Sequence, residues 1–439
     1  MPRNSARGAG TALLRVSARG TISTLATALL LVSAPAGAQQ NGEAQQRLQP
    51  GETVLDRDRP RLDPRGVTAG GFLVFPSVSL EGEYNDNIFA NPSGDDVESD
   101  YITHLRPNVS VESRWANHAL NFRAGADLAA YDDYSGEDYE DYNIGVDGRY
   151  DVTRNDNLFG GASYRRGHED RGSPDDVNGK EPTEYDNYNA FAGGEVQWNR
   201  VTTRVTATYD RLDYDDVPRA GGGTIDNDDR DRDTYEGRAR ISYQIQRRFA
   251  TFVEGAYDVR SYDETKNSGF DRDSEGYELA VGMDFDLTGV TFGEVFAGYR
   301  SQDYDDPALE TADGWDAGVS LTSNVSQLTS VRATFERSLR ETTQRDASGY
   351  FTNLTTLRVD HELLRNLLLD AEASYSLNDY QGIGREDDVW SAGIGATYMV
   401  NRYAEAELGY THSARDSSET DRDYDYTRNR VMLELTAQY

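Results

Sequence analysis

The chain has 439 residues and no cysteine, which excludes disulfides, thiolate metal sites and cysteine nucleophiles. Its 44 basic residues stand against 77 acidic residues, a net charge of −33, so nucleic acid is not an expected partner. Mean hydropathy is −0.74, and past the N-terminus no apolar run is long enough for a membrane-spanning helix. A transmembrane β-barrel escapes this test, because only every second strand residue faces lipid.

The first 38 residues have the form of an export signal. They contain four arginines and no acid, and an apolar run over residues 25–32 follows these arginines. The small residues Ala36, Gly37 and Ala38 then supply a cleavage site. We expect cleavage near Ala38 and export to the envelope of a Gram-negative bacterium. The alternative is an uncleaved N-terminal anchor.

Residues 39–70 are predicted to be a disordered periplasmic linker. The stretch is rich in glutamine and then mixes prolines with charges of both signs, which gives no usable period. The alternative is a docking segment for a periplasmic partner. The linker is too short to fill a wide barrel, so a gated receptor with an N-terminal plug is disfavoured.

From Phe72 onward the chain repeats the pattern of amphipathic strands. In the first of them Val78, Leu80 and Tyr84 alternate with polar residues, which places the two sets on opposite faces. About eighteen such strands follow one another, and an even number returns both termini to the periplasmic side. The connections alternate between tight turns and long acidic loops, as in outer-membrane barrels. Residues 71–439 are therefore predicted to form an all-β, transmembrane, antiparallel up-and-down barrel.

A soluble β-sandwich or propeller is the competing fold. Repeats of about forty residues can be counted along the chain, as in propeller blades. However, a sandwich gives no reason for loop length to alternate so regularly, and eighteen strands with one apolar face would need two or three separate cores. The alternation therefore favours the barrel.

The two ends of the predicted barrel resemble known outer-membrane proteins. An opening strand with a proline leads to an aromatic residue and D-N-x-F, carried by Pro76, Tyr84, Asp86, Asn87 and Phe89. In this the sequence resembles the family called putative beta-barrel porin 2. The closing strand ends on the aromatic Tyr439, the form in which many such barrels carry the signal read by the barrel-assembly machinery. The resemblance implies a fold and a cellular location rather than a specific function.

Charged residues occupy the strand face opposite the apolar one. Charges at this density cannot face lipid, where an arginine near the midplane costs roughly 2–4 kcal/mol. They are expected to line the lumen at Arg123, Asp147, Arg149, Glu195, Arg204, Arg238, Arg240, Glu254, Arg260, Glu278, Asp284, Arg300, Arg332, Glu336, Arg358, Asp370, Glu372, Glu405, Glu407, Arg430 and Glu434. One interpretation is cross-strand pairing that stiffens the wall; the other is a charged pathway that selects solutes.

A barrel of 16–18 strands leaves an aqueous channel unless something plugs it. We therefore predict a porin-like passive channel for small hydrophilic solutes. The acidic balance of the chain predicts cation preference, although the arginine-rich wall could reverse it locally. The alternative is a non-transporting structural or accessory barrel associated with surface polysaccharide export, a setting in which proteins resembling this family are sometimes placed.

Several predicted loops place acidic residues beside tyrosine or asparagine, as at 132–134, 137–139, 214–216, 226–233 and 304–306. Such loops could bind divalent cations or bridge through them to the phosphates of surrounding lipopolysaccharide. The alternative is a solvated acidic rim. Outer-membrane lipids are expected partners in either case.

The sequence contains no recognisable catalytic or cofactor motif. Its five histidines are scattered, and none belongs to a nucleophile or zinc motif. His168 and His412 lie near predicted outer strand ends, where barrel enzymes build their sites, but a surface histidine is the simpler interpretation. We expect neither an enzyme nor a bound cofactor.

Overall fold

The computed structural model describes residues 52–92, 97–263, 269–287, 289–342, 344, 346–419 and 424–439. The predicted export signal at 1–38 and the first part of the linker lie outside the described residues. No helix in these described ranges is long and apolar enough to cross a membrane. Apart from strands, they contain two short 3-10 helices, η1 (Ser135–Glu137) and η2 (Asp228–Arg230).

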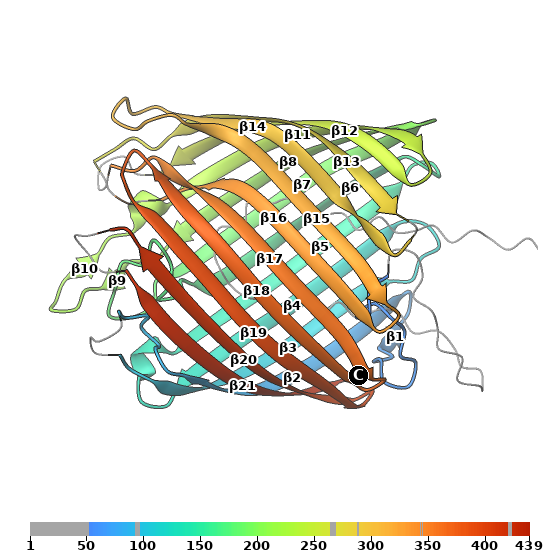
Figure 1. Cartoon of the computed structure of the whole chain (residues 1–439), viewed down its shortest axis with the longest axis horizontal. Helices are drawn as coiled ribbons and strands as arrows, with labels where there is room; N and C mark the ends of the chain where they lie inside the picture. The colour runs from blue at the N-terminus through green and yellow to red at the C-terminus, as the bar shows by residue number, and fades with distance from the viewer. Residues whose placement is uncertain are drawn as a thin grey trace, which may run out of the picture.

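Eighteen long strands form one closed antiparallel barrel (Figure 1). The first nine are β2 (Phe72–Asn85), β3 (Asp100–Ser113), β4 (Ala119–Tyr131), β5 (Tyr139–Asp151), β6 (Asn157–His168), β7 (Glu184–Trp198), β8 (Val201–Tyr214), β11 (Arg232–Gln246) and β12 (Phe249–Tyr262). The other nine are β13 (Ser274–Leu287), β14 (Thr291–Tyr304), β15 (Ala312–Ser326), β16 (Thr329–Arg340), β17 (Gly349–Leu364), β18 (Leu367–Gln381), β19 (Glu386–Asn401), β20 (Ala404–Ser417) and β21 (Tyr426–Gln438).

Pairing between the first and last long strands closes the sheet. β2 and β21 run antiparallel from the pair Ser77 and Gln438 to the pair Asn85 and Arg430. A short strand, β1 (Val67–Ala69), pairs with the start of β2. β9 (Val217–Pro218) and β10 (Thr224–Ile225) form a small hairpin outside the wall. The predicted antiparallel barrel and its eighteen strands are confirmed.

The outer face of the wall is an exposed apolar belt. Ile394 is 64% exposed, Leu279 is 61% exposed and Leu433 is 51% exposed, the reverse of what a soluble core requires. Charged residues alternate with them on the inner face, as at Glu278 and Glu434. An apolar outer band over a polar interior is the pattern of a transmembrane barrel.

The two rims of the barrel differ in loop length. At one rim the strands join through tight turns, such as Asn199 and Arg200 between β7 and β8, where Asn199 adopts the left-handed φ of 58°. At the other rim the connections are long, such as residues 169–183 between β6 and β7. The start of β2 and the end of β21 both lie at the short-turn rim (Figure 1).

A disordered linker is expected for residues 39–70, but the described part of this range, residues 52–70, is ordered against the barrel. Val54 is fully buried, and its amide donates to the Ser330 hydroxyl at 2.8 Å. The Gly66 amide donates to the carbonyl of Tyr439 at 3.2 Å, beside the closing seam. The alternating charges of this segment find partners inside the barrel mouth, which a search for local periodicity cannot detect.

Candidate functional site: a charged lumen and its two mouths

Ion pairs join neighbouring strands along one part of the inner wall. The Arg238 guanidinium lies 2.8 Å from Glu254 and 3.3 Å from Glu278, and Arg300 lies 2.5 Å from Glu278. Strand register explains these contacts, because Glu278 and Arg300 stand directly opposite each other on β13 and β14. The guanidinium fork can hold more than one carboxylate, so three strands are linked through few side chains.

Arg240 extends this paired region toward the short-turn rim. Its guanidinium lies 2.9 Å from both Asp284 and Glu294 and 3.7 Å from Glu254. It also lies over the Phe252 ring, at 3.4 Å from the ring centroid. A cation held between carboxylates and an aromatic face has little freedom to move. The wall formed by β11 to β14 is therefore rigid.

The remaining predicted positions follow the same strand face. These positions form ion pairs as follows: Arg123 with Asp147 at 2.8 Å, Arg204 with Glu195 at 3.4 Å, Arg358 with Glu372 at 3.3 Å and with Asp370 at 3.6 Å, Arg149 with Asp151 at 2.8 Å, and Glu434 with Arg106 at 3.1 Å. Arg332 and Glu336 are exposed on β16, Glu405 and Glu407 lie on β20, and Arg430 stands opposite Asn85.

Water reaches parts of the inner wall and is kept from others. The Arg123 side chain is 63% exposed, whereas the Arg238 side chain is only 16% exposed. The wall near β4 therefore faces open, wet space, and the wall near β11 is covered by its own ion pairs. Ion pairs between strands therefore cover one part of the lumen, and exposed charge lines another part. The selection of solutes by this charge stays a prediction.

Loops from nearly opposite sides meet across the long-loop mouth. The Thr342 hydroxyl, in the connection after β16, donates to the Asp175 carboxylate, in the connection after β6, at 2.6 Å. The Arg415 guanidinium donates to the carbonyl of Gly172 at 3.1 Å. We call residues 169–176 the crossing segment, because it contacts strands far from its own.

A buried ion pair anchors the start of the crossing segment. Glu169 accepts two hydrogen bonds from Arg230, at 2.6 and 2.9 Å, and the two side chains are 2% and 5% exposed. The Arg230 guanidinium also lies 4.0 Å from the centroid of the Tyr214 ring. At the other side of the mouth, Arg428 lies 3.1 Å from Asp170. Charge-assisted bonds of this kind hold a loop in one place.

The carboxyl of Asp231, the residue after Arg230, has a raised pKa. Burial raises the pKa of Asp231 to about 7, and the nearby Asp213, Asp228 and Asp263 act in the same direction. The backbone amide of Tyr214 donates to this carboxyl at 2.6 Å, which opposes the rise. Asp231 is only 6% exposed, so this carboxyl titrates in the range where most surface aspartates are fully ionised.

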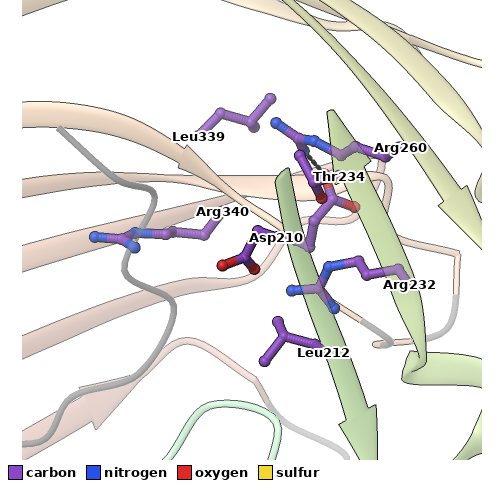
Figure 2. A pocket seen from close by; sticks show the side chains of 8 residues that line it. Asp210, Leu212, Arg232, Thr234, Arg260, Leu339 and Arg340 are labelled. Carbon is purple, nitrogen blue, oxygen red and sulfur yellow. Dashed lines mark hydrogen bonds and ion pairs between the residues drawn. The ribbon is translucent and has the colours of Figure 1, made fainter. Parts of the chain in front are cut away.

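The connection after β16 folds against the inner wall beside a small recess. Arg272 donates to the carbonyls of Ala347 and Gln344, at 2.9 and 3.2 Å. Glu341 accepts from the Tyr262 hydroxyl at 2.9 Å and pairs with Arg260. Figure 2 shows the recess, which is lined by Asp210, Leu212, Arg232, Thr234, Arg260, Leu339, Arg340 and Glu341. Cationic groups therefore gather where the mouth narrows.

The N-terminal segment crosses the short-turn mouth. Arg57 and Arg59 each lie 3.0 Å from the Glu362 carboxylate, and all three side chains are at most 5% exposed. The Asn324 amide donates to the carbonyl of Glu52 at 2.6 Å. The segment thus runs from the seam at β21 to the inner ends of β15 to β17 and narrows this opening.

Sequence reasoning found the inner-wall charges but missed the contacts at both mouths. Arg57, Arg59, Glu169 and Arg230 lie in segments without periodicity, and their partners are far away in the chain. The missed inner-face residues Glu81 and His104 belong to the alternation of β2 and β3, which gave a signal that could have been used.

The acidic loops remain a prediction as cation sites. Asp216, Asp226 and Asp228 bring carboxylate oxygens within 4.8 Å of one another, but all three residues are exposed. Tyr439 packs against Tyr403 at a ring distance of 5.7 Å and donates its amide to the Pro76 carbonyl. Its role as an assembly signal also stays a prediction.

A closed eighteen-strand barrel with an apolar outer belt and a charged inner wall defines a porin-like barrel of the outer membrane. Residues 59–439 match the family described as Putative beta-barrel porin 2, and the chain belongs to this family. No curated protein matches the sequence significantly.

The chain is also similar to solved barrels from Pseudomonas aeruginosa. OpdK with vanillate is 9% identical with a TM-score of 0.45, and the match covers 83% of this chain and 99% of that chain. OpdO is 13% identical with a TM-score of 0.43, covering 83% and 97%. The siderophore receptor PirA is 10% identical with a TM-score of 0.42, covering 83% and 80%.

Proposed function

We propose that this barrel is a passive channel for small hydrophilic solutes, and that it has no enzymatic activity. The observation that carries the proposal is the exposed inner face, where the Arg123 side chain is 63% exposed beside the Asp147 carboxylate. A charged side chain in contact with solvent inside a closed wall lies on a wet pathway. Family membership supports the same role.

The two narrowed mouths set the size of the solute. The crossing segment restricts the long-loop end, and residues 52–66 restrict the short-turn end. Solutes are therefore small, and the net acidic chain favours cations. The barrel is expected to reach the membrane through an N-terminal export signal and the barrel-assembly machinery, and to contact lipopolysaccharide.

Liposome swelling tests this proposal. Proteoliposomes that contain the mature protein are diluted into sugars of increasing size, and entry is followed by light scattering. The proposal predicts entry of small sugars and a sharp loss of rate with size. Swelling no faster than in protein-free liposomes, for every sugar, would contradict it.

A second candidate is a structural or accessory barrel associated with surface polysaccharide export. The observation that favours it is the hydrogen bond between Thr342 and Asp175, because a joined mouth leaves less room for solutes. This candidate predicts a folded barrel that stays silent in the swelling assay both before and after Thr342→Val. Faster swelling in the variant would favour the channel.

A further inference from the structure

A cluster of metal-ligand side chains lies on the inner face of β2 and β3. Glu81 and Glu83 are on β2, and His104 stands directly opposite Glu81 on β3. One ligand atom from each of the three lies within 4.8 Å of the others. Glu81 and His104 are each 4% exposed, and Glu83 is half-buried. The cluster adjoins the seam at which β2 and β21 close the barrel.

The hydrogen bond on the far side of His104 fixes which nitrogen is free. Nδ1 of His104 lies 3.1 Å from the Asp127 carboxylate, and an ionised carboxylate can only accept. Nδ1 therefore carries the proton and donates it to Asp127. This leaves the lone pair on Nε2, and a carboxylate behind a histidine is the arrangement that orients metal-binding histidines.

The free nitrogen has no partner in the protein. Nε2 of His104 is buried, and it neither accepts nor donates a hydrogen bond. The Glu81 carboxylate faces it at 3.9 Å, which exceeds hydrogen-bond distance, so a second proton on the ring would also remain unbonded. A buried polar atom without a partner is costly. A cation between Nε2 and the carboxylates removes this cost.

The surrounding charge also favours a cation. Arg106 lies 2.7 Å from Glu81, 2.9 Å from Asp127 and 3.1 Å from Glu434, so one guanidinium serves three carboxylates. Glu83 adds a fourth carboxylate, and the nearby Arg430 and Arg428 offset only part of the total. Negative charge remains in excess, as a divalent ion requires.

We propose that Glu81, Glu83 and His104 bind a divalent transition-metal ion of the zinc type. One imidazole nitrogen and two carboxylates suit such an ion better than Mg²⁺ or Ca²⁺, which prefer oxygen ligands alone. Asp127 acts as the positioning residue, and Arg106 keeps the Glu81 carboxylate in place. Because its ligands come from two neighbouring strands, the ion links β2 to β3 beside the seam.

Zinc titration of the purified, chelator-treated full-length barrel in detergent tests the proposal. Calorimetry is expected to give one strong site in the wild type, and Zn²⁺ is expected to raise the unfolding temperature. Replacing a residue that orients a metal ligand typically weakens binding about 10–100-fold. His104→Ala removes a ligand outright and should weaken binding at least that much. Glu83→Gln tests the half-buried ligand where its substitution least disturbs packing.

His168 provides a matched control. Its Nδ1 lies 3.0 Å from the Asp141 carboxylate, the same kind of pair as His104 with Asp127. Within the described ranges, however, no group of three close ligands includes His168. His168→Ala should therefore retain zinc binding. Heat-modifiable migration on gels verifies that each variant is folded.

Equal zinc binding by wild type, His104→Ala and Glu83→Gln would overturn the proposal, as would the absence of binding by the wild type. Co²⁺ gives a second readout, because its visible absorption reports nitrogen coordination that His104→Ala should abolish. The proposal is independent of transport. A barrel that binds zinc but does not conduct would refute only the channel, and a conducting barrel without zinc affinity would refute only the metal site.

Discussion

The Thr342 hydroxyl donates a 2.6 Å hydrogen bond to the Asp175 carboxylate and thereby joins two connections that begin on nearly opposite sides of the barrel. The bond is short, and burial raises the pKa of the Asp175 carboxyl that accepts it. The long-loop mouth is therefore held by contacts that can be removed one at a time without altering the wall.

Thr342→Val is expected to loosen this mouth. Loss of a side-chain hydrogen bond costs about 0.5–1.5 kcal/mol, which corresponds to a roughly two- to tenfold shift toward separated loops. We expect a larger open probability in single-channel recordings. Thr352→Val is the control, because the Thr352 hydroxyl donates at 3.0 Å to Asn378 on the neighbouring strand, within the wall. Equal effects of the two substitutions would show that the cross-mouth bond has no special role.

Glu362→Gln is expected to release the N-terminal segment from the short-turn mouth. The substitution removes the charge that holds Arg57 and Arg59, and breaking a buried ion pair by removing one partner costs about 3–5 kcal/mol. Protease cleavage between residues 52 and 66 should become faster while the barrel stays folded. Glu336→Gln, at an exposed position of the inner wall, should leave cleavage unchanged. Unchanged protection in Glu362→Gln would refute this docking.

The stability of the folded connections at the long-loop mouth is expected to fall as pH rises from about 4 to about 7. Burial raises the pKa of Asp231 from 3.8 to about 7, so in this range the unfolded state releases the proton and the folded state retains it. The effect is at most about 4 kcal/mol, and it is complete above pH 7. Hydrogen-exchange protection factors at residues 226–231 measure this loss of stability.

Asp231→Asn should abolish the pH dependence of the protection factors over the same interval, that is, of the exchange rates corrected for intrinsic amide exchange. Asparagine does not titrate, and its side-chain oxygen still accepts the bond from the Tyr214 amide. If the wild type and the variant respond equally to pH, another group is responsible.

Arg123→Glu is expected to strengthen cation preference. The Arg123 side chain is exposed on the inner wall, so reversing its charge makes the wet part of the lumen more negative. The reversal potential under a salt gradient should shift toward the cation value. Arg200→Glu makes the same charge change in the exposed turn after β7 and should shift it less. An equal shift in both variants would indicate an effect of total charge alone.

The fold could be predicted from the sequence because each strand repeats the same two-residue period. Val431, Leu433 and Leu435 alternate with polar residues, and this alternation alone assigns an outer and an inner face. The alternation of loop length then gave the order and direction of the strands. These signals are local, and a barrel of antiparallel neighbours is built from local connections.

The mouths could not be predicted, because their contacts join residues far apart in the chain. Thr342 contacts Asp175 across 167 residues of sequence, and Arg57 contacts Glu362 across 305 residues. Thr342, Asp175 and Arg57 lie outside the periodic strands, so a single sequence assigns them only to a loop or linker and gives Glu362 no partner. The pairing of His104 with Asp127 is different, because strand alternation already places both on the inner face.

Single-channel recording in a planar bilayer, with the purified mature barrel, tests the central claim most directly. The passive-channel account predicts stepwise openings and a reversal potential that favours cations under a salt gradient. A barrel that is folded by heat-modifiable migration yet gives no openings, in the wild type and in Thr342→Val alike, would contradict it.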